Sequence, residues 1–173
     1  RTLSLSAAIL LLLVCALLMG RLAAVSADGR LHVTFLDVGS ADAIFIESPS
    51  GGHVLINGGP SSAAVSDALG RRMSPLDGNL EWLIVASTDE QQVASLPRLL
   101  DRFPPANVLF GAPEQASFSS AALMEQLIAG EFALQRAEAG QTLHLGDGAA
   151  LKVLDVSSRG TTLLLEWNTF RML

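Results

Sequence analysis

Cysteine and clustered basic residues are scarce in this sequence of 173 residues. The single cysteine, Cys15, excludes a disulfide framework and a thiolate metal site. Lys152 is the only lysine, and Arg71 with Arg72 is the only adjacent pair of basic residues. The 17 acidic residues outnumber the 11 basic ones, which gives a net charge of −6. Because nucleic-acid surfaces need clustered cations, the composition argues against such a surface on this chain.

Histidines are few and lie far apart in the sequence. His32, His53 and His144 each fall in a predicted strand, where we expect a solvent-facing or hydrogen-bonded side chain rather than a metal ligand. No Ser-His-Asp or Cys-His arrangement can be assembled from the residues present. Gly58-Gly59-Pro60 precedes a predicted helix, but it lacks the P-loop pattern and the P-loop lysine, and therefore indicates a turn.

The N-terminal run from Leu3 to Met19 is almost entirely apolar and is just long enough to predict a membrane-spanning helix. A first residue that is Arg rather than Met favours an internal membrane helix. The alternative is a secretory signal, because Val25-Ser26-Ala27 resembles a small-residue cleavage site. We therefore divide the sequence into a transmembrane helix with a short hinge, residues 1–29, and a soluble domain, residues 30–173.

Three short apolar runs open the soluble domain and predict consecutive antiparallel strands, because turn residues bound each run. These strands are expected from Leu31 to Val38, from Ala43 to Glu47 and from His53 to Asn57. Asp37, Asp42 and Asn57 stand where the strands end. Polar residues that a rigid scaffold places at strand ends are candidates for a functional site.

The rest of the domain predicts short helices that alternate with short strands, which is typical of a mixed α/β sheet covered by helices on one face. Helices are expected over about 63–73 and 92–103 and from Ser119 or Ser120 to about 127, and strands over 80–86, 108–110, 134–137, 143–145 and 151–156. The segments 161–167 and 170–173 predict a hairpin. The last strand has no cap or polar tail, so we expect the sequence to be a fragment at both ends.

Three motifs follow one another around the first predicted strands. They read Phe35-Leu36-Asp37-Val38-Gly39, then Asp42-Ala43, then Leu55-Ile56-Asn57-Gly58-Gly59-Pro60. Together they resemble the start of the metallo-β-lactamase-like domain of ComEC-type competence proteins, which are membrane DNA-uptake channels. The family pattern is roughly F-L-D-V-G-Q-G-D-A followed by V-L-I-D-G-G, so Ser40-Ala41 and Asn57 depart from it. The resemblance implies an αββα sandwich, incomplete at its C-terminus and preceded by one transmembrane helix.

In that family, the strand that corresponds to Leu80–Ala86 carries the metal motif H-x-H-x-D-H at its C-terminal end. Here the four ligand positions of the motif hold Ser87, Asp89, Gln91 and Gln92. Serine and glutamine are poor zinc or manganese ligands, and Asn57 lacks the charge with which an aspartate could orient a ligand. We therefore expect no metal cofactor and no metal-dependent hydrolysis here, although the resemblance implies zinc or manganese in intact relatives.

The resemblance implies a membrane-tethered part of a ComEC-like protein that keeps the fold without its reaction. Its location would be a bacterial cell membrane with the soluble domain on the extracytoplasmic side. Its partners would be the membrane, other parts of the same protein and, through the whole channel, DNA. One alternative is a hydrolase with a rebuilt magnesium site, because magnesium accepts oxygen ligands. The ligands of that site would be Asp37, Asp42, Asp89 and Glu90. A second alternative is a secreted binding module without catalysis.

Overall fold

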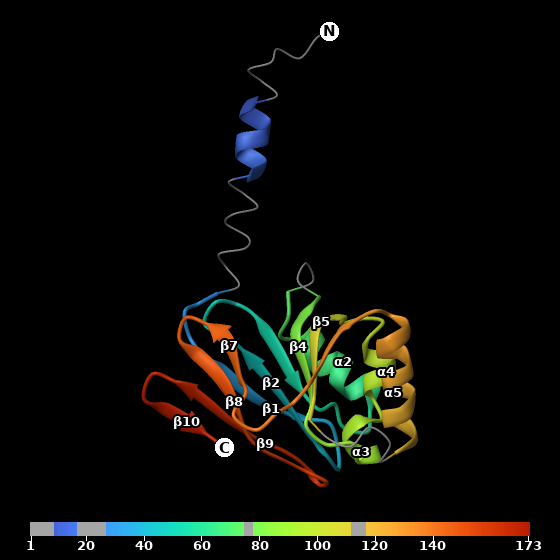
Figure 1. The fold of residues 1–173 in the computed structure, drawn as a ribbon. Helices are drawn as coiled ribbons and strands as arrows, with labels where there is room; N and C mark the ends of the chain where they lie inside the picture. The colour runs from blue at the N-terminus through green and yellow to red at the C-terminus, as the bar shows by residue number, and fades with distance from the viewer. Residues whose placement is uncertain (1–8, 17–26, 75–77, 112–116) are drawn as a thin grey trace.

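The computed structural model describes residues 9–16, 27–74, 78–111 and 117–173 (Figure 1). Its larger sheet has six strands in the order β1-β2-β3-β4-β5-β6. These are β1 (His32–Asp37), β2 (Asp42–Glu47), β3 (His53–Ile56), β4 (Leu80–Val85), β5 (Pro105–Phe110) and β6 (Ala133–Arg136). The smaller sheet has the order β10-β9-β8-β7, from β7 (Thr142–Gly146), β8 (Ala149–Ser157), β9 (Gly160–Trp167) and β10 (Phe170–Met172).

The direction of pairing changes within the six-stranded sheet. β1, β2 and β3 pair antiparallel, which confirms the predicted meander, whereas β3, β4, β5 and β6 pair parallel. Parallel neighbours need crossover connections, and helices supply them. The four-stranded sheet is antiparallel throughout, with β9 and β10 forming the expected C-terminal hairpin.

The helices cover one face of the six-stranded sheet, and the four-stranded sheet covers the other face (Figure 1). The helices are α2 (Ser62–Gly70), α3 (Glu90–Val93), α4 (Leu96–Leu99) and α5 (Phe118–Ala129). Three of the four layers of the expected αββα sandwich are therefore present. No helix of the described residues 27–74, 78–111 and 117–173 covers the outer face of the four-stranded sheet in Figure 1.

Strand β4 lies between two hydrophobic clusters. Leu83 and Val85 belong to the cluster between the larger sheet and the helices. Ile84 and the following Ala86 belong to the cluster between the two sheets. Alternate residues of a strand point to opposite faces, so a strand that is buried on both sides has a continuous apolar sequence. This burial explains why the segment 80–86 lacks the polar alternation of a surface strand.

Two helix predictions need correction. The helix expected over 92–103 is divided into α3 and α4. Pro97 lies in the first turn of α4 and has no backbone N–H, so it cannot continue the hydrogen bonds of α3. The cap of α5 is Ser117, not Ser119 or Ser120; Ser117 and Ser120 form a reciprocal capping box. Ser61 caps α2, where its hydroxyl accepts from the N–H of Ala64.

Residues 9–16 form a helix with exposed apolar side chains. The remainder of the predicted run from Leu3 to Met19 lies outside the described residues, as does the segment 17–26. None of the helices in the described part of the chain combines the length and the apolar content needed to cross a membrane.

Candidate functional site

The candidate site lies where β3, β4 and β5 end. Because these strands are parallel, their carboxyl ends meet at one edge of the sheet, which is where ligands bind in open α/β sheets. Asn57 follows β3, Ala86 and Ser87 follow β4, and Gly111 follows β5. Ladder hydrogen bonds extend into this edge: the N–H of Asn57 donates to Ile84 O, and that of Gly111 donates to Val85 O, at 2.9 Å each.

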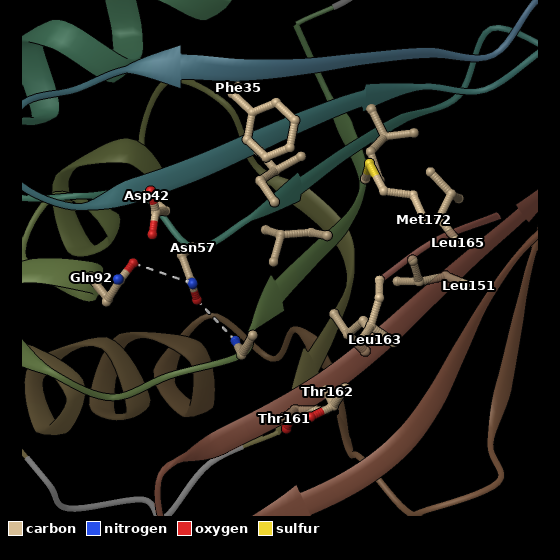
Figure 2. A pocket seen from close by; sticks show the side chains of 15 residues that line it. Phe35, Asp42, Asn57, Gln92, Leu151, Thr161, Thr162, Leu163, Leu165 and Met172 are labelled. Atoms are coloured by element: carbon tan, nitrogen blue, oxygen red, sulfur yellow. Dashed lines mark hydrogen bonds between the residues drawn. The ribbon is translucent and has the colours of Figure 1, made fainter.

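Asn57 joins the ends of two strands through its side chain (Figure 2). Its Oδ1 accepts hydrogen bonds from the N–H groups of Ala86 at 3.0 Å and Ser87 at 3.3 Å. Its φ of 55° lies in the left-handed region, which asparagine tolerates better than most residues. The side chain therefore fixes the start of the loop from Ser87 to Gln92, whose positions the resemblance aligns with the metal motif.

The second contact of Asn57 reaches the last position of that motif. Its Nδ2 donates to Oε1 of Gln92 at 3.3 Å (Figure 2). The backbone carbonyl of Gln92 also accepts from the N–H groups of Gly58 and Gly59, at 2.9 Å each. Gln92 thus holds the turn after β3 with both its backbone and its side chain. At two positions where the resemblance implies an aspartate and a histidine, the chain has two amides bonded to each other.

Ser87, Asp89 and Gln91, at the other motif positions, also form hydrogen bonds within the protein. Ser87 Oγ accepts from the N–H of Asp89 at 3.3 Å, and Gln91 Oε1 accepts from Ser40 Oγ at 3.3 Å. The side chains of Asp89 and Gln91 are exposed, and Asp89 makes no side-chain cap bond to α3. Ser40, which departs from the family pattern, therefore contacts a second departing residue.

The four carboxylates of the magnesium alternative do not gather at one point. Asp37 and Asp42 are opposite each other in the β1–β2 register, and both are exposed. Asp37 forms no side-chain hydrogen bond with a described residue, and Gly39, with a φ of 106°, lies in the turn that follows β1. Within the described ranges, no group of three or more His, Cys, Asp or Glu side chains could hold a metal ion. The side chains of this loop therefore do not fit the zinc or manganese that the resemblance implies.

Glu90 faces a different element. Its carboxylate accepts from the hydroxyl and the N–H of Ser119, at the start of α5. The hydroxyl of Ser119, and then its N–H, hold the pKa of Glu90 below the ordinary value. Glu90 therefore links the start of α3 to the start of α5 rather than facing the motif.

This link predicts a small pH dependence. A carboxylate with a lowered pKa in the folded state adds stability above its unfolded pKa, and this stability is lost as the pH falls through the folded value. Because Glu90 is exposed, we expect Glu90→Gln to lower the free energy of unfolding at pH 7 by less than about 1 kcal/mol. Urea unfolding at pH 7 and pH 3 should show a smaller difference for the variant than for the natural chain. Glu125→Gln, an exposed change within α5, is the control; an equal effect of both variants would contradict the link.

The histidines lie in strands, as predicted, and away from the site. His32 of β1 is exposed and contacts Asp28 at 2.9 Å. His53 of β3 is buried and stacks on Phe45 at 5.5 Å between ring centroids. His144 lies in β7 and is exposed. The stacking places His53 on the helix side of the larger sheet, where Phe45 belongs to the core.

The β8–β9 hairpin forms the other side of the site, and no pattern in the sequence predicted this position for it. The N–H of Thr161 donates to Ala86 O at 2.8 Å, and the Thr161 hydroxyl donates to Gly111 O. Gly160 has a φ of 141°, and a Cβ there would lie 2.6 Å from Ala86 O. The hairpin can therefore lie against the end of β4 only because residue 160 has no side chain. Arg159 of this hairpin and Ser87 after β4 line the same hollow.

Comparison with solved structures gives proteins of similar fold. A motif mutant of the Cronobacter sakazakii metallo-β-lactamase with a HARLDQ motif has a TM-score of 0.55 and 18% identity, over 81% of this chain and 56% of that chain. The metallo-β-lactamase SMB-1, solved with mercaptoacetic acid, has a TM-score of 0.55 and 16% identity, over 78% and 55%. A mutant flavo di-iron protein from Thermotoga maritima has a TM-score of 0.51 and 21% identity, over 72% and 30%.

These similarities show that the chain has a mixed α/β, metallo-β-lactamase-like fold. The chain spans little more than half the length of the metallo-β-lactamases that it matches. No protein-family model matches the chain, and no curated protein matches it. At these identities the similarity concerns the fold and not the reaction.

Proposed function

We propose that this chain is a non-catalytic, metallo-β-lactamase-like domain of a ComEC-like DNA-uptake protein. The observation that carries this proposal is the contact between Asn57 and Gln92. Their amides hydrogen-bond each other at positions where the family pattern places an aspartate and a histidine. Two side-chain amides that hydrogen-bond each other can hold the loop in place without binding an ion.

The donor set of the loop supports the same conclusion. A catalytic zinc site uses three protein ligands and keeps one open position, and a two-metal site uses more. Asp89 is the only strong ligand among the four motif positions. Glu90 is bound to Ser119. Without a metal, no bound water has its pKa lowered toward neutrality, and the family's route to a hydroxide nucleophile is absent.

The proposed setting is a bacterial cell membrane, with this domain on the extracytoplasmic side. The support is the apolar run from Leu3 to Met19, together with the motifs that resemble the competence family. In this setting the domain is a structural or docking part that contacts other parts of the same membrane protein, and DNA reaches it only through the complete channel. Release of the expressed chain from membranes by carbonate alone would contradict the tether.

The experiment that tests the proposal measures DNA cleavage and DNA binding by the natural chain. With zinc or manganese added, we expect no cleavage of single- or double-stranded DNA. At physiological salt we expect no submicromolar binding, because the 17 acidic residues outnumber the 11 basic ones and phosphate neutralisation needs several cations in one place. Of the only adjacent pair, Arg71 is paired with Asp67 and Arg72 donates to Ala68 O.

Two sets of variants separate the proposed function from a rebuilt hydrolase and from a nucleic-acid surface. Metal-dependent cleavage that disappears in Asp89→Ala would establish a rebuilt hydrolase. Submicromolar DNA binding that disappears when Arg71 and Arg72 are replaced by glutamine would establish a nucleic-acid surface. Either result would overturn the corresponding part of the proposal.

A further inference from the structure

The two sheets do not close completely on each other. A cavity of about 430 Å³ lies between them, within the usual range for small-molecule sites (Figure 2). Its walls are apolar side chains from both sheets: Ile44, Ile46, Ile56, Leu151, Leu163 and Leu165. Ile44 and Leu163 remain partly exposed, although both belong to the faces that pack together. An apolar cavity of this size is suited to a hydrocarbon chain.

One end of the cavity is polar. Asn57, Thr161 and Thr162 line this end, and the same three residues with Ala86 also line a second hollow of about 290 Å³. The two hollows therefore adjoin. Ser87, Ser157 and Arg159 complete the second hollow. A ligand that occupies both would place an apolar part between the sheets and a polar part among hydroxyl groups and a guanidinium.

The charged residues around the two hollows indicate that the polar part of the ligand is negatively charged. Arg159 is the only charged residue that lines the second hollow, and it forms no ion pair with a carboxylate of the described residues. Asp42 lines the cavity from the other side of Asn57, beside Gln92 and away from Thr161 and Thr162 (Figure 2). A negative group is therefore attracted toward Arg159 and repelled from Asp42. Because Arg159 is the one cation at this end among the described residues, it can neutralise a ligand group with one negative charge but not a group with two.

We propose that this site binds a single-chain amphiphile with a carboxylate head, such as a medium-chain fatty acid. The hydrocarbon chain lies between the sheets, and the carboxylate lies at Arg159, whose planar guanidinium can bind both carboxylate oxygens. Binding requires no metal and no reaction. The inference goes beyond the proposed function and does not depend on it. Ser87, Asn57 and Gln92 line the two hollows, but binding needs neither a metal nor DNA, and the tested residues Arg159 and Leu163 are not motif positions.

The energetics give two expected magnitudes. Each methylene group removed from water strengthens binding by roughly fourfold, so each two-carbon step should strengthen it by about 15-fold until the cavity is full. Loss of a charge-assisted hydrogen bond at Arg159 should weaken carboxylate binding by about tenfold. An uncharged alcohol of the same length should not respond to the loss of Arg159.

The experiment titrates the whole chain with hexanoate, octanoate and decanoate below their micelle concentrations, and with decanol. We expect saturable binding of one decanoate and the stated increase with chain length. Arg159→Gln should weaken decanoate and leave decanol unchanged. Leu163→Trp, which fills the cavity, should abolish binding of both. Arg98→Gln makes the same charge change on the exposed face of α4 and should have no effect.

Several outcomes would overturn the proposal. These are equal decanoate binding by the natural chain and a folded Leu163→Trp variant, an affinity that does not depend on chain length, and an Arg159→Gln variant with unchanged decanoate affinity. If Leu163→Trp does not fold, the comparison of decanoate with decanol in Arg159→Gln still decides, because Arg159 is exposed in a turn. Binding to phosphatidylglycerol vesicles without saturable binding of free decanoate would show a membrane surface instead.

Discussion

Histidines and an aspartate placed at the four motif positions after β4 are expected to give this chain a higher zinc affinity than the natural sequence has. The changes are Ser87→His, Asp89→His, Gln91→Asp and Gln92→His. Asn57 Oδ1 still holds the N–H groups of Ala86 and Ser87 in this variant, so the loop keeps its backbone position. Three imidazoles and one carboxylate then converge from one loop, which exceeds the three protein ligands of a catalytic zinc site.

The expected size of this effect is large. A metal that binds only the folded state, at one hundred times its dissociation constant, adds about 2.7 kcal/mol of stability. For a domain of this length that amounts to a rise of roughly 5–11 °C in the unfolding midpoint. Titration with zinc and thermal unfolding with and without zinc measure the two quantities.

A variant with only two of the histidines, Asp89→His with Gln92→His, is the matched control and should bind more weakly, because it offers fewer ligands. The opposite result would be stoichiometric zinc in the natural chain that is lost in Asp89→Ala. That result would show that the present side chains already form a metal site.

Replacement of Asn57 by alanine should cause the largest loss of stability among single changes in the site, about 2–5 kcal/mol. Alanine in the left-handed region costs about 1–2 kcal/mol, and N–H groups left without an acceptor cost about 1–3 kcal/mol. Asn57→Asp should cost less than about 1 kcal/mol, because a carboxylate can accept the same two hydrogen bonds. Asn57→Gly should fall between them, since it removes the backbone strain but not the lost bonds.

Asn168 supplies the control for backbone strain. Its φ is 53°, close to the 55° of Asn57, but it lies exposed in the β9–β10 turn, and its side chain has no hydrogen bond to a described residue. Asn168→Ala should therefore show the conformational cost alone. Urea unfolding of both alanine variants measures the difference, and equal losses would mean that the Asn57 side-chain bonds contribute no stability.

Local sequence patterns predicted the strands and the mixed α/β class because those patterns report burial directly. Strand β4 is the clearest example, since a strand buried on both faces must be apolar at successive positions. The division between α3 and α4 was also present in the sequence as Pro97. A helical apolar spacing continued past it, and that spacing reflects packing on the sheet rather than continuous helical hydrogen bonds.

The arrangement of the site could be predicted only in part. Turn residues after β3, and the end of the apolar run at Ala86, indicated that Asn57 and the loop from Ser87 lie at strand ends. The contact between Asn57 and Gln92 joins residues 35 positions apart. The hollow lined by both Arg159 and Ser87 depends on how the second sheet packs on the first. Neither arrangement leaves a local pattern in the sequence, because residue spacing determines which face a side chain occupies but not which distant segment covers it.

Because the protein has two separate hydrophobic clusters, its two sheets need not unfold together. The cluster between the helices and the larger sheet contains no side chain from β7 to β10, whereas the cluster between the sheets depends on those strands. The four-stranded sheet also pairs only strands adjacent in the sequence. It can therefore detach as a cooperative unit while β2 to β5 stay folded against the helices. Backbone amides of β7 to β10 should exchange with deuterium through this partial opening, at lower free energy than those of β3 and β4, which exchange only on complete unfolding.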